Sequence, residues 1–317
     1  MLSYNKLKDR PRDFLAVTSL TLEEFQRVLP AFQEAYEHRY PTALTRTGNP
    51  RQRRAGGGAK GVLQCFEDKL LFILVYQKTN PLQTLHAWQF EMSQPQANYW
   101  IHQLLPVLQQ ALATLGLAPE RDARLLPTSP LLLEGAPATA LDGTERRRQR
   151  PTDAQRQKEH YSGKKKTHTD KNILLVNEMT HKVISLGPTL AGKTHDKKAV
   201  DAAQVAYPSN ATLDKDTGFQ GYEPPGTLTL QPKKKPRGRE LSAGERLLNR
   251  LISSVRVVVE HVIAGVKRCR IVKDVLRLTK EGVSDLVMEI ACGLHNLRVS
   301  CRHPLPVFDV LSLVDPS

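Results

Sequence analysis

The chain has 317 residues, 40% of them hydrophobic and 25% charged, which is the composition of a globular protein of about two domains. Its 46 lysines and arginines exceed its 32 aspartates and glutamates, and the net charge of +14 favours nucleic acid as the partner, with an anionic membrane surface as the alternative. The sequence shows no apolar run of the roughly 18 residues that a membrane span needs, no signal peptide and only four cysteines, so we expect a protein of the reducing cytoplasm.

Residues 1–118 are expected to form an all-helical domain. Thr21-Leu22-Glu23-Glu24 is a capping box, in which a hydroxyl and a carboxylate satisfy the first amides of a helix. Apolar residues then recur at helical spacing, namely Phe25, Val28, Leu29 and Phe32. The spacing predicts a helix that buries this stripe.

Three further helices are predicted before residue 118, over 67–78, 82–89 and 94–115. The turn Glu91-Met92-Ser93 joins the last two, so we expect a helix-turn-helix at about 82–115. Ordinary helical hairpins share this layout, but the positive charge of the chain favours a DNA-binding module.

Two segments show no periodicity. Residues 51–58 form a basic, glycine-rich loop that either touches phosphates or is a solvated linker. The spacing of its glycines excludes a P-loop. Residues 119–137 are rich in proline and leucine, and we expect them to link two domains.

Residues 138–317 are expected to form a second domain of mixed α+β structure, because strand patterns precede helical ones. The strands are predicted at 138–141, 172–177, 181–186 and 211–213, and the helices at 247–267 and 284–298. Ten apolar positions of the first helix follow a 3.6-residue period. Its opposite face carries Asn249, Ser253, Arg256, Glu260 and Lys267.

Two basic clusters interrupt this domain. The first holds ten cations, which are Arg146, Arg147, Arg148, Arg150, Arg156, Lys158, Lys164, Lys165, Lys166 and Lys171. The second holds Lys233, Lys234, Lys235, Arg237 and Arg239. A single cluster is usually a solvated loop, but two in a chain of this charge favour contacts with the phosphates of a polyanion, which supply affinity without sequence choice.

Three acids stand out by their context. Asp142 follows the apolar run of the first strand, Asp216 follows the last strand, and Glu260 lies on the polar face of the long helix. Strand-end aspartates that face a helical glutamate can hold two divalent ions, and carboxylate oxygens suit Mg²⁺ or Mn²⁺. Two such ions support phosphoryl transfer. Asp214 is a rival to Asp216 on spacing alone.

The sequence resembles the DDE transposases of bacterial insertion sequences, in the branch related to eukaryotic Harbinger-type transposases. The matching motifs are Leu141-Asp142-Gly143-Thr144-Glu145 with Arg150-Pro151, Tyr161-Ser162-Gly163-Lys164-Lys165-Lys166, Gly192-Lys193-Thr194-His195-Asp196, Asp216-Thr217-Gly218-Phe219-Gln220-Gly221, Asn249-Arg250-Leu251-Ile252-Ser253-Ser254 and Arg256-Val257-Val258-Val259-Glu260-His261. The helix-turn-helix region also resembles that of the family, so the likeness covers nearly the whole chain in the right order.

The resemblance implies an RNase H-like catalytic domain in which Asp142, Asp216 and Glu260 bind two Mg²⁺ or Mn²⁺ ions. It implies that water attacks a phosphodiester at a transposon end, and that the freed 3′-hydroxyl then attacks target DNA. Only Asp216 heads the Thr-Gly-Phe-Gln-Gly run of the family. Arg256, Glu260 and Lys267 match a related helix signature, but Ser253 stands where its tyrosine would be.

The implied partners are double-stranded DNA, as terminal inverted repeats and target, and a second copy of the chain, because two DNA ends must be held together. The expected location is the bacterial cytoplasm, at the nucleoid. Phosphate contacts are assigned to Lys164, Lys165, Lys166, Arg256 and Lys267, and to Lys233, Lys234 and Lys235. His195-Asp196 resembles a family loop motif that either lies near the active site or caps a helix.

Other readings of the sequence remain open. Cys292, His295, Cys301 and His303 could bind zinc, but their spacing is unlike that of structural zinc sites, and we expect buried cysteines and surface histidine instead. Two other functions compete with a transposase. One is a non-catalytic DNA-binding derivative, and the other is a metal-dependent nuclease that cuts without joining.

Overall fold

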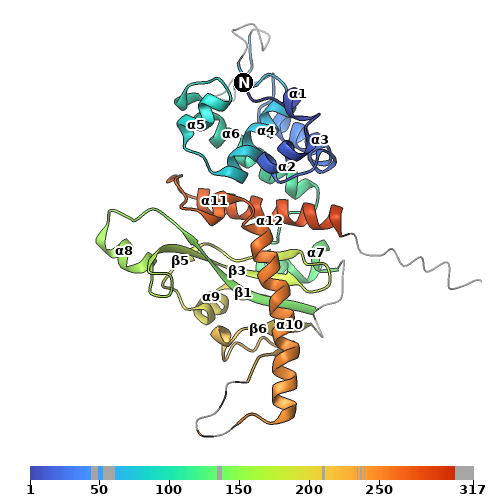
Figure 1. Cartoon of the computed structure of the whole chain (residues 1–317), viewed down its shortest axis with the longest axis vertical. Coiled ribbons are helices and arrows are strands. Elements are labelled where there is room, and N and C mark those ends of the chain that lie inside the picture. The colour runs from blue at the N-terminus through green and yellow to red at the C-terminus, as the bar shows by residue number, and fades with distance from the viewer. Residues whose placement is uncertain are drawn as a thin grey trace, which may run out of the picture.

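The computed structural model describes residues 1–43, 49–52, 61–133, 138–208, 211–233, 235, 238 and 240–303, with the side chains of residues 251, 254 and 255 excepted. Most of the predicted glycine-rich loop, at residues 53–58, lies outside the described residues. A helical bundle forms one end of the molecule and a β-sheet lies toward the other, with helix α12 (Val283–Arg302) between them (Figure 1).

The N-terminal region is helical, as predicted. Its helices are α1 (Tyr4–Leu7), α2 (Pro11–Thr18), α3 (Leu22–Arg39), α4 (Phe66–Thr79), α5 (Gln83–Gln89) and α6 (Gln94–Thr114). The capping box at the start of α3 is confirmed, since Thr21 Oγ1 accepts from the amide of Glu24 at 3.2 Å and Glu24 Oε2 accepts from the amide of Thr21 at 2.8 Å. The sequence had not indicated α1 and α2, which are short.

The predicted helix-turn-helix corresponds to α5 and α6. The turn between them contains Glu91 at a φ of 52°, and Ser93 caps α6 through a second capping box with Gln96. The side chains of Gln94 and Asn98, in the first turns of α6, both donate to Gln83 Oε1 on α5. The two helices are therefore fixed to each other at the end where α6 begins.

The segment 119–137 contains more structure than a linker. The described part of it forms the short helices η1 (Ala123–Thr128) and α7 (Pro130–Leu133). Leu126, Leu131 and Leu132 are buried in the core on one face of the sheet. Apolar side chains, rather than helical periodicity, hold this segment against the second domain.

The second domain is a mixed sheet with helices on both faces, which confirms the predicted α+β class. Among the described residues the strands are β1 (Ala138–Arg147), β2 (Tyr161–Ser162), β3 (Thr167–Asn177), β4 (Val183–Leu186), β5 (Leu190–Ala191), β6 (Thr212–Lys215) and β7 (Leu228–Leu230). Their order is β2-β3-β1-β6-β7, and β4 and β5 also pair with β3. β1 and β3 are antiparallel, whereas β6 and β7 run parallel to β1. An antiparallel hairpin system followed by parallel strands is consistent with the RNase H-like arrangement.

Alternation along the strands assigns their side chains to two cores. Ala140, Leu174 and Val176 face the core that contains residues of α10 (Ala243–Val266) and α12, whereas Leu141 and Leu175 face the opposite core. The remaining helices are α8 (Ala154–His160), α9 (Asp196–Ala203), η2 (Thr217–Phe219) and α11 (Arg270–Lys273). Figure 1 shows α10 running across the sheet and continuing well past it.

The start of α10 departs from the prediction that its apolar stripe is buried. Leu247 and Leu248 are 59% and 38% exposed, whereas Val259, Val262 and Val266 are buried. The stripe is therefore a core element only where the helix crosses the sheet.

Helix α12 joins the two ends of the molecule. The fully buried amide of Asn296 donates to the carbonyls of Leu117 and Val183, and its oxygen accepts from the amide of Val183. Gln109 of α6 donates to Glu289 at 2.8 Å. One continuous core extends from Leu7 in the helical region to Leu297 in α12. The helical region and the sheet thus share a core.

The zinc alternative finds no support in the described part of the chain. Cys292 is completely buried in α12, and the His295 ring lies 3.0 Å from the carbonyl of His181. Burial raises the pKa of the Cys292 thiol and lowers the pKa of His295 to about 4. These side chains pack the interior, as expected for Cys292 but not for His295, which had been expected at the surface.

Candidate active site

The three predicted acids come from three elements that meet at one place. Asp142 lies in the middle of β1 opposite Leu174, and not at a strand end as predicted. β1 continues to Arg147 because its polar residues stay paired with β3. Asp216 directly follows β6, and Glu260 projects from α10.

The acids share a face of the sheet. Asp142 lies two residues from Ala140, which packs toward α10, and β6 runs beside β1 in parallel. Asp142, Asp216 and Glu260 consequently line one small cavity, together with Arg256 and Val259 of α10. Arg256 Nη2 lies 3.4 Å from Asp216 Oδ2. Within the described ranges, no three His, Cys, Asp or Glu side chains are close enough together to hold a metal ion as they stand.

The surroundings of Asp142 disfavour its charged form. Burial raises its pKa to about 6, and the neighbouring carboxylates of Asp216 and Asp196 add to the rise. The amide of Gly143, which donates to Asp142 Oδ1 at 2.7 Å, and the guanidinium of Arg256 act in the opposite direction. The site therefore concentrates negative charge in a partly desolvated place.

A basic groove borders the acids. It is a cavity of about 450 Å³, which Asp142 and Glu260 line at one side. Its cations are Arg147, Lys164, Lys165, Lys267 and Lys273. Burial, and then the charge of Lys165, lowers the pKa of Lys267. The groove thus places clustered positive charge directly beside the carboxylates.

The structure brings only part of the predicted phosphate-binding set together. Lys164, Lys165 and Lys267 line the groove, and Arg256 lies against Asp216. Lys166 is exposed on the same turn but does not line it. Sequence reasoning had not singled out Arg147 for phosphate contact, and had not considered Lys273.

The second cluster lies apart from the groove. Lys233 is paired with Glu245 at 3.3 Å, and Lys235 is paired with Glu240. Lys234, Arg237 and Arg239 are outside the described residues. Nothing in the described part of this cluster reaches the acids.

Three cations of the first cluster are engaged in contacts within the protein. Arg146 is 3% exposed and donates to Asn172, Thr189 and Ser284. Arg148 pairs with buried Asp170, and Lys171 pairs with Asp196. These side chains hold the sheet to its helices and are not free to contact DNA.

Asp214, the rival of Asp216, belongs to a different pair. It borders the small cavity, but its carboxyl is hydrogen-bonded to that of Glu178, at the end of β3. Burial, and then Asp214, raises the pKa of Glu178 to about 8, and burial raises that of Asp214. Asp214 is therefore engaged with Glu178, which leaves Asp216 as the better partner for Asp142.

The variant Glu178→Gln is expected to lose part of the pH dependence of stability. The pKa of Glu178 rises from 4.5 to about 8 on folding, so the native state keeps a proton that the unfolded chain releases in this window. Stability of the wild type therefore falls as pH rises from 4.5 to about 8, and the glutamine removes that fall. Urea unfolding at about pH 5 and about pH 8 measures it. Glu37→Gln, at an exposed site of α3, is the control, and identical slopes for both variants would contradict the account.

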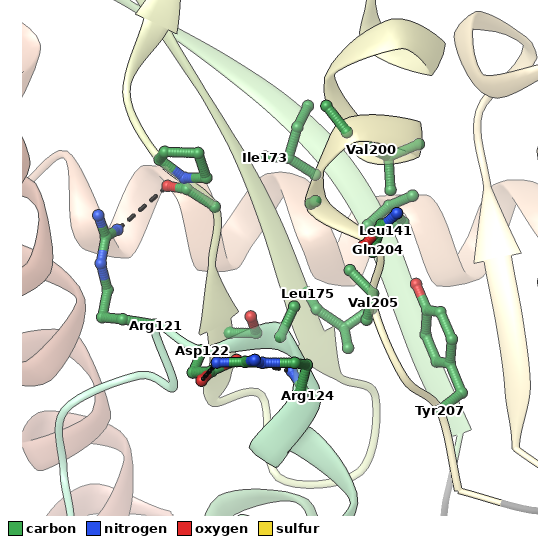
Figure 2. Close-up of a pocket in the computed structure, with 16 residues that line it drawn as sticks. Arg121, Asp122, Arg124, Leu141, Ile173, Leu175, Val200, Gln204, Val205 and Tyr207 are labelled. Carbon is green, nitrogen blue, oxygen red and sulfur yellow. Dashed lines mark hydrogen bonds and ion pairs between the residues drawn. The ribbon is translucent and has the colours of Figure 1, made fainter.

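A third cavity, of about 470 Å³, lies on the opposite face of the sheet. Figure 2 shows Leu141, Ile173 and Leu175 lining it from the sheet and Val200 from α9. Its charged lining residues already have partners. Arg124 pairs with Asp122, and Arg121 donates to backbone carbonyls and pairs with Asp285. None of the predicted site residues lines it.

A mixed sheet that directs acids toward a basic groove, attached to a helix-turn-helix, defines an enzyme that acts on the phosphodiester backbone of DNA. Residues 141–296 match the family described as DDE superfamily endonuclease, and residues 62–114 match the helix-turn-helix of DDE superfamily endonuclease. The chain belongs to this family, as a DDE-type insertion-sequence transposase with an N-terminal helix-turn-helix.

Two relatives are named as transposases. The probable transposase for insertion sequence element IS702 of Microchaete diplosiphon is 22% identical over 283 residues, which cover 89% of this chain and 97% of the relative. The putative transposase for insertion sequence element IS112 of Streptomyces albus G is 28% identical over 235 residues, 74% of this chain and 80% of the relative. No solved structure matches the chain. No helix among the described residues has the length and apolar character to cross a membrane.

Proposed function

We propose that the protein catalyses metal-dependent strand cleavage at transposon ends and transfer of the freed strand into target DNA. The observation that carries this proposal is the convergence of Asp142, Asp216 and Glu260 on one cavity beside the basic groove. The named relatives support it, since both are described as transposases of insertion sequences. The proposed location is the bacterial cytoplasm, at the nucleoid.

The chemistry of the three acids suits two Mg²⁺ or Mn²⁺ ions, once the side chains draw together around them. Asp142, Asp216 and Glu260 would hold them, and their all-oxygen donor set is the kind that these ions prefer. The raised pKa of Asp142, caused by burial and by nearby carboxylates, marks a place where added positive charge is favourable. When bound, such ions stabilise the attacking and the leaving oxygen of an in-line displacement.

The chain itself supplies binding and orientation. Lys164, Lys165 and Lys267 would bind phosphates on either side of the scissile bond, with Arg147 and Lys273 extending the contact along the groove. Arg256 is placed to balance the charge at Asp216. In each of the two steps, one phosphorus–oxygen bond forms as another breaks, first with water and then with the 3′-hydroxyl as the nucleophile.

The proposed partners are the terminal inverted repeats of the element and the target DNA. The helix-turn-helix of α5 and α6 would contact the repeats, and the groove would hold the strand that is cut. Because two ends must be joined to one target, we propose that a homodimer or higher oligomer forms on DNA.

The test is an assay with DNA duplexes that carry the element's own ends. Cleavage and joining are followed on labelled strands with Mg²⁺, with Mn²⁺ and with EDTA, alongside a gel-shift measurement of binding. The proposal expects metal-dependent cleavage followed by joining of the 3′-end. Cleavage without joining would replace the transposase by a nuclease, and binding without cleavage would leave a non-catalytic DNA-binding derivative.

The groove makes a separate prediction for salt dependence. Lys165→Ala should lower the slope of log affinity against log salt by about 1, because it removes one phosphate contact. Lys235→Ala removes an equal charge from a lysine that is paired with Glu240 outside the groove, and it should leave the slope unchanged. Fluorescence anisotropy with labelled duplex measures both. Equal slopes for the two variants would argue against the groove as the DNA path.

A further inference from the structure

Asp196 is a fourth carboxylate, near enough to Asp142 to act on its charge, and it has no part in the proposed chemistry. It is the first residue of α9, and His195 before it caps the helix by accepting from the amide of Lys197 at 3.3 Å. The two residues of the sequence motif thus do different things. His195 caps its own helix, whereas the Asp196 carboxylate lies against Gly143 and Gly218.

The Asp196 carboxylate fills the space between two glycines. A Cβ atom added at Gly143 would lie 3.1 Å from Asp196 Oδ1, and one added at Gly218 would lie 3.0 Å from Asp196 Oδ2. Gly143 directly follows Asp142, and Gly218 lies two residues after Asp216. Each oxygen of one carboxylate therefore lies in the space that a side chain would take beside one of the two aspartates.

A buried lysine fixes Asp196 in this place. Lys171 Nζ lies 2.8 Å from Asp196 Oδ1 and donates to the carbonyl of Thr194 at 2.6 Å. The Lys171 side chain is only 10% exposed and belongs to β3, which pairs with β1. An ion pair shielded from water in this way holds its partner more firmly than a surface pair. Asp196 thus connects α9 and β3 to the strand of Asp142 and to the turn after Asp216.

We propose that Asp196 is a positioning residue, which sets the separation of Asp142 and Asp216 by packing its carboxylate between Gly143 and Gly218. The role rests on the proposed function, because it concerns the two aspartates as ligands of divalent ions. Outer groups that orient ligands typically change metal affinity by about 10- to 100-fold when they are removed. A side chain at either position would crowd the Asp196 carboxylate, and neither glycine has the positive φ that would favour glycine for its backbone conformation.

The test compares Asp196→Asn with Asp201→Asn in the full chain. Both aspartates lie on α9 and pair with a lysine, but the Lys197–Asp201 pair is exposed and is not among the nearest neighbours of Gly143 or Gly218. Isothermal titration with Mn²⁺ should show about tenfold weaker binding for Asp196→Asn and no change for Asp201→Asn. Cleavage by Asp196→Asn should recover as the Mn²⁺ concentration rises, because the ligands themselves are intact. Thermal unfolding checks that both variants are folded.

A double-mutant cycle tests the contact itself. Gly143→Ala should weaken Mn²⁺ binding in the wild type, but much less in Asp196→Ala, where the added methyl group has room. Additive effects, or wild-type affinity in Asp196→Asn, would overturn the proposal. Complete loss of binding in Asp196→Asn, equal to that in Asp142→Asn, would make Asp196 a ligand instead. A wild type that neither binds Mn²⁺ nor cuts DNA would overturn the proposed function, and this role with it.

Discussion

Asp142→Asn is expected to abolish cleavage and joining while it makes the metal-free protein more stable. Asp216→Asn and Glu260→Gln should share the loss of activity, about 1,000-fold or more, because each removes a charge that the proposed chemistry requires. DNA binding should persist in all three variants, since the cations of the groove remain. Strand cleavage and gel shifts on the same DNA measure the two effects separately.

The gain in stability follows from the pKa of Asp142. Burial, aided by Asp216 and Asp196, raises this pKa from 3.8 to about 6. Between these pH values the native state binds a proton that the unfolded chain has lost, so stability falls as pH rises and the full penalty applies above about 6. This rise in the pKa of Asp142 corresponds to a loss of at most about 3 kcal/mol in the free energy of unfolding. Asparagine carries no charge and escapes this penalty.

Urea unfolding in EDTA tests the prediction at two pH values. The difference between Asp142→Asn and wild type should be largest at about pH 8 and close to zero below about pH 4. Asp201→Asn, at an exposed pair on α9, should change stability little at either pH. Full cleavage activity in Asp142→Asn would remove this residue from the site. A missing gain at high pH would show that its carboxylate is not desolvated.

Periodicity predicted the element that carries Glu260, because local spacing alone determines which face of a helix is polar. The same reasoning failed at the start of α10, where Leu247 and Leu248 continue the stripe but are exposed. Whether an apolar face is covered depends on how far the helix extends past the sheet. That distance is a property of the assembled fold and not of the helix sequence.

The position of Asp142 within its strand was not predictable from its neighbours. The apolar run stops at Leu141, whereas β1 continues through polar residues as far as Arg147. Arg146 can be buried there only because Asn172, Thr189 and Ser284 accept its hydrogen bonds. These partners come from distant segments, and polar residues in a strand resemble a loop until the partners are known.

The groove shows the same limit. Lys273 and Arg147 line the same groove although they are far apart in sequence. Their segments are joined where the amide of Leu276 donates to the carbonyl of Arg147 at 3.1 Å. Composition indicated an excess of cations, but it could not tell which of them line the groove. Lys165 does, whereas Lys171 forms an ion pair with Asp196. The three acids could be predicted from sequence motifs and their order along the chain. The residues of the proposed phosphate-binding surface could be identified only from the tertiary structure.

The second large effect is expected where α12 meets the helical region. Arg302 Nε lies 2.7 Å from Glu24 Oε1, and Arg302 Nη2 lies 2.8 Å from Glu24 Oε2 and donates to the carbonyl of Ser19. The Glu24 side chain is only 2% exposed. Arg302→Met would leave that carboxylate buried without its cation, which costs about 3 kcal/mol or more. Chemical denaturation of the full chain measures the loss, and Glu24→Gln in the same background should restore part of it.

The matched control is Arg270→Met, which removes an arginine from an exposed ion pair with Asp274 four residues along the chain. Its effect should stay below about 0.5 kcal/mol. Because one core extends from Leu7 to Leu297, Arg302→Met should lower the stability of the whole molecule in a single transition. Separate unfolding of the helical region, with the sheet unchanged, would show that α12 does not couple them. A single transition would show that α12 connects the helical region rigidly to the sheet. DNA bound by the helix-turn-helix would then be held at a fixed position relative to the sheet, as a flexible linker would not do.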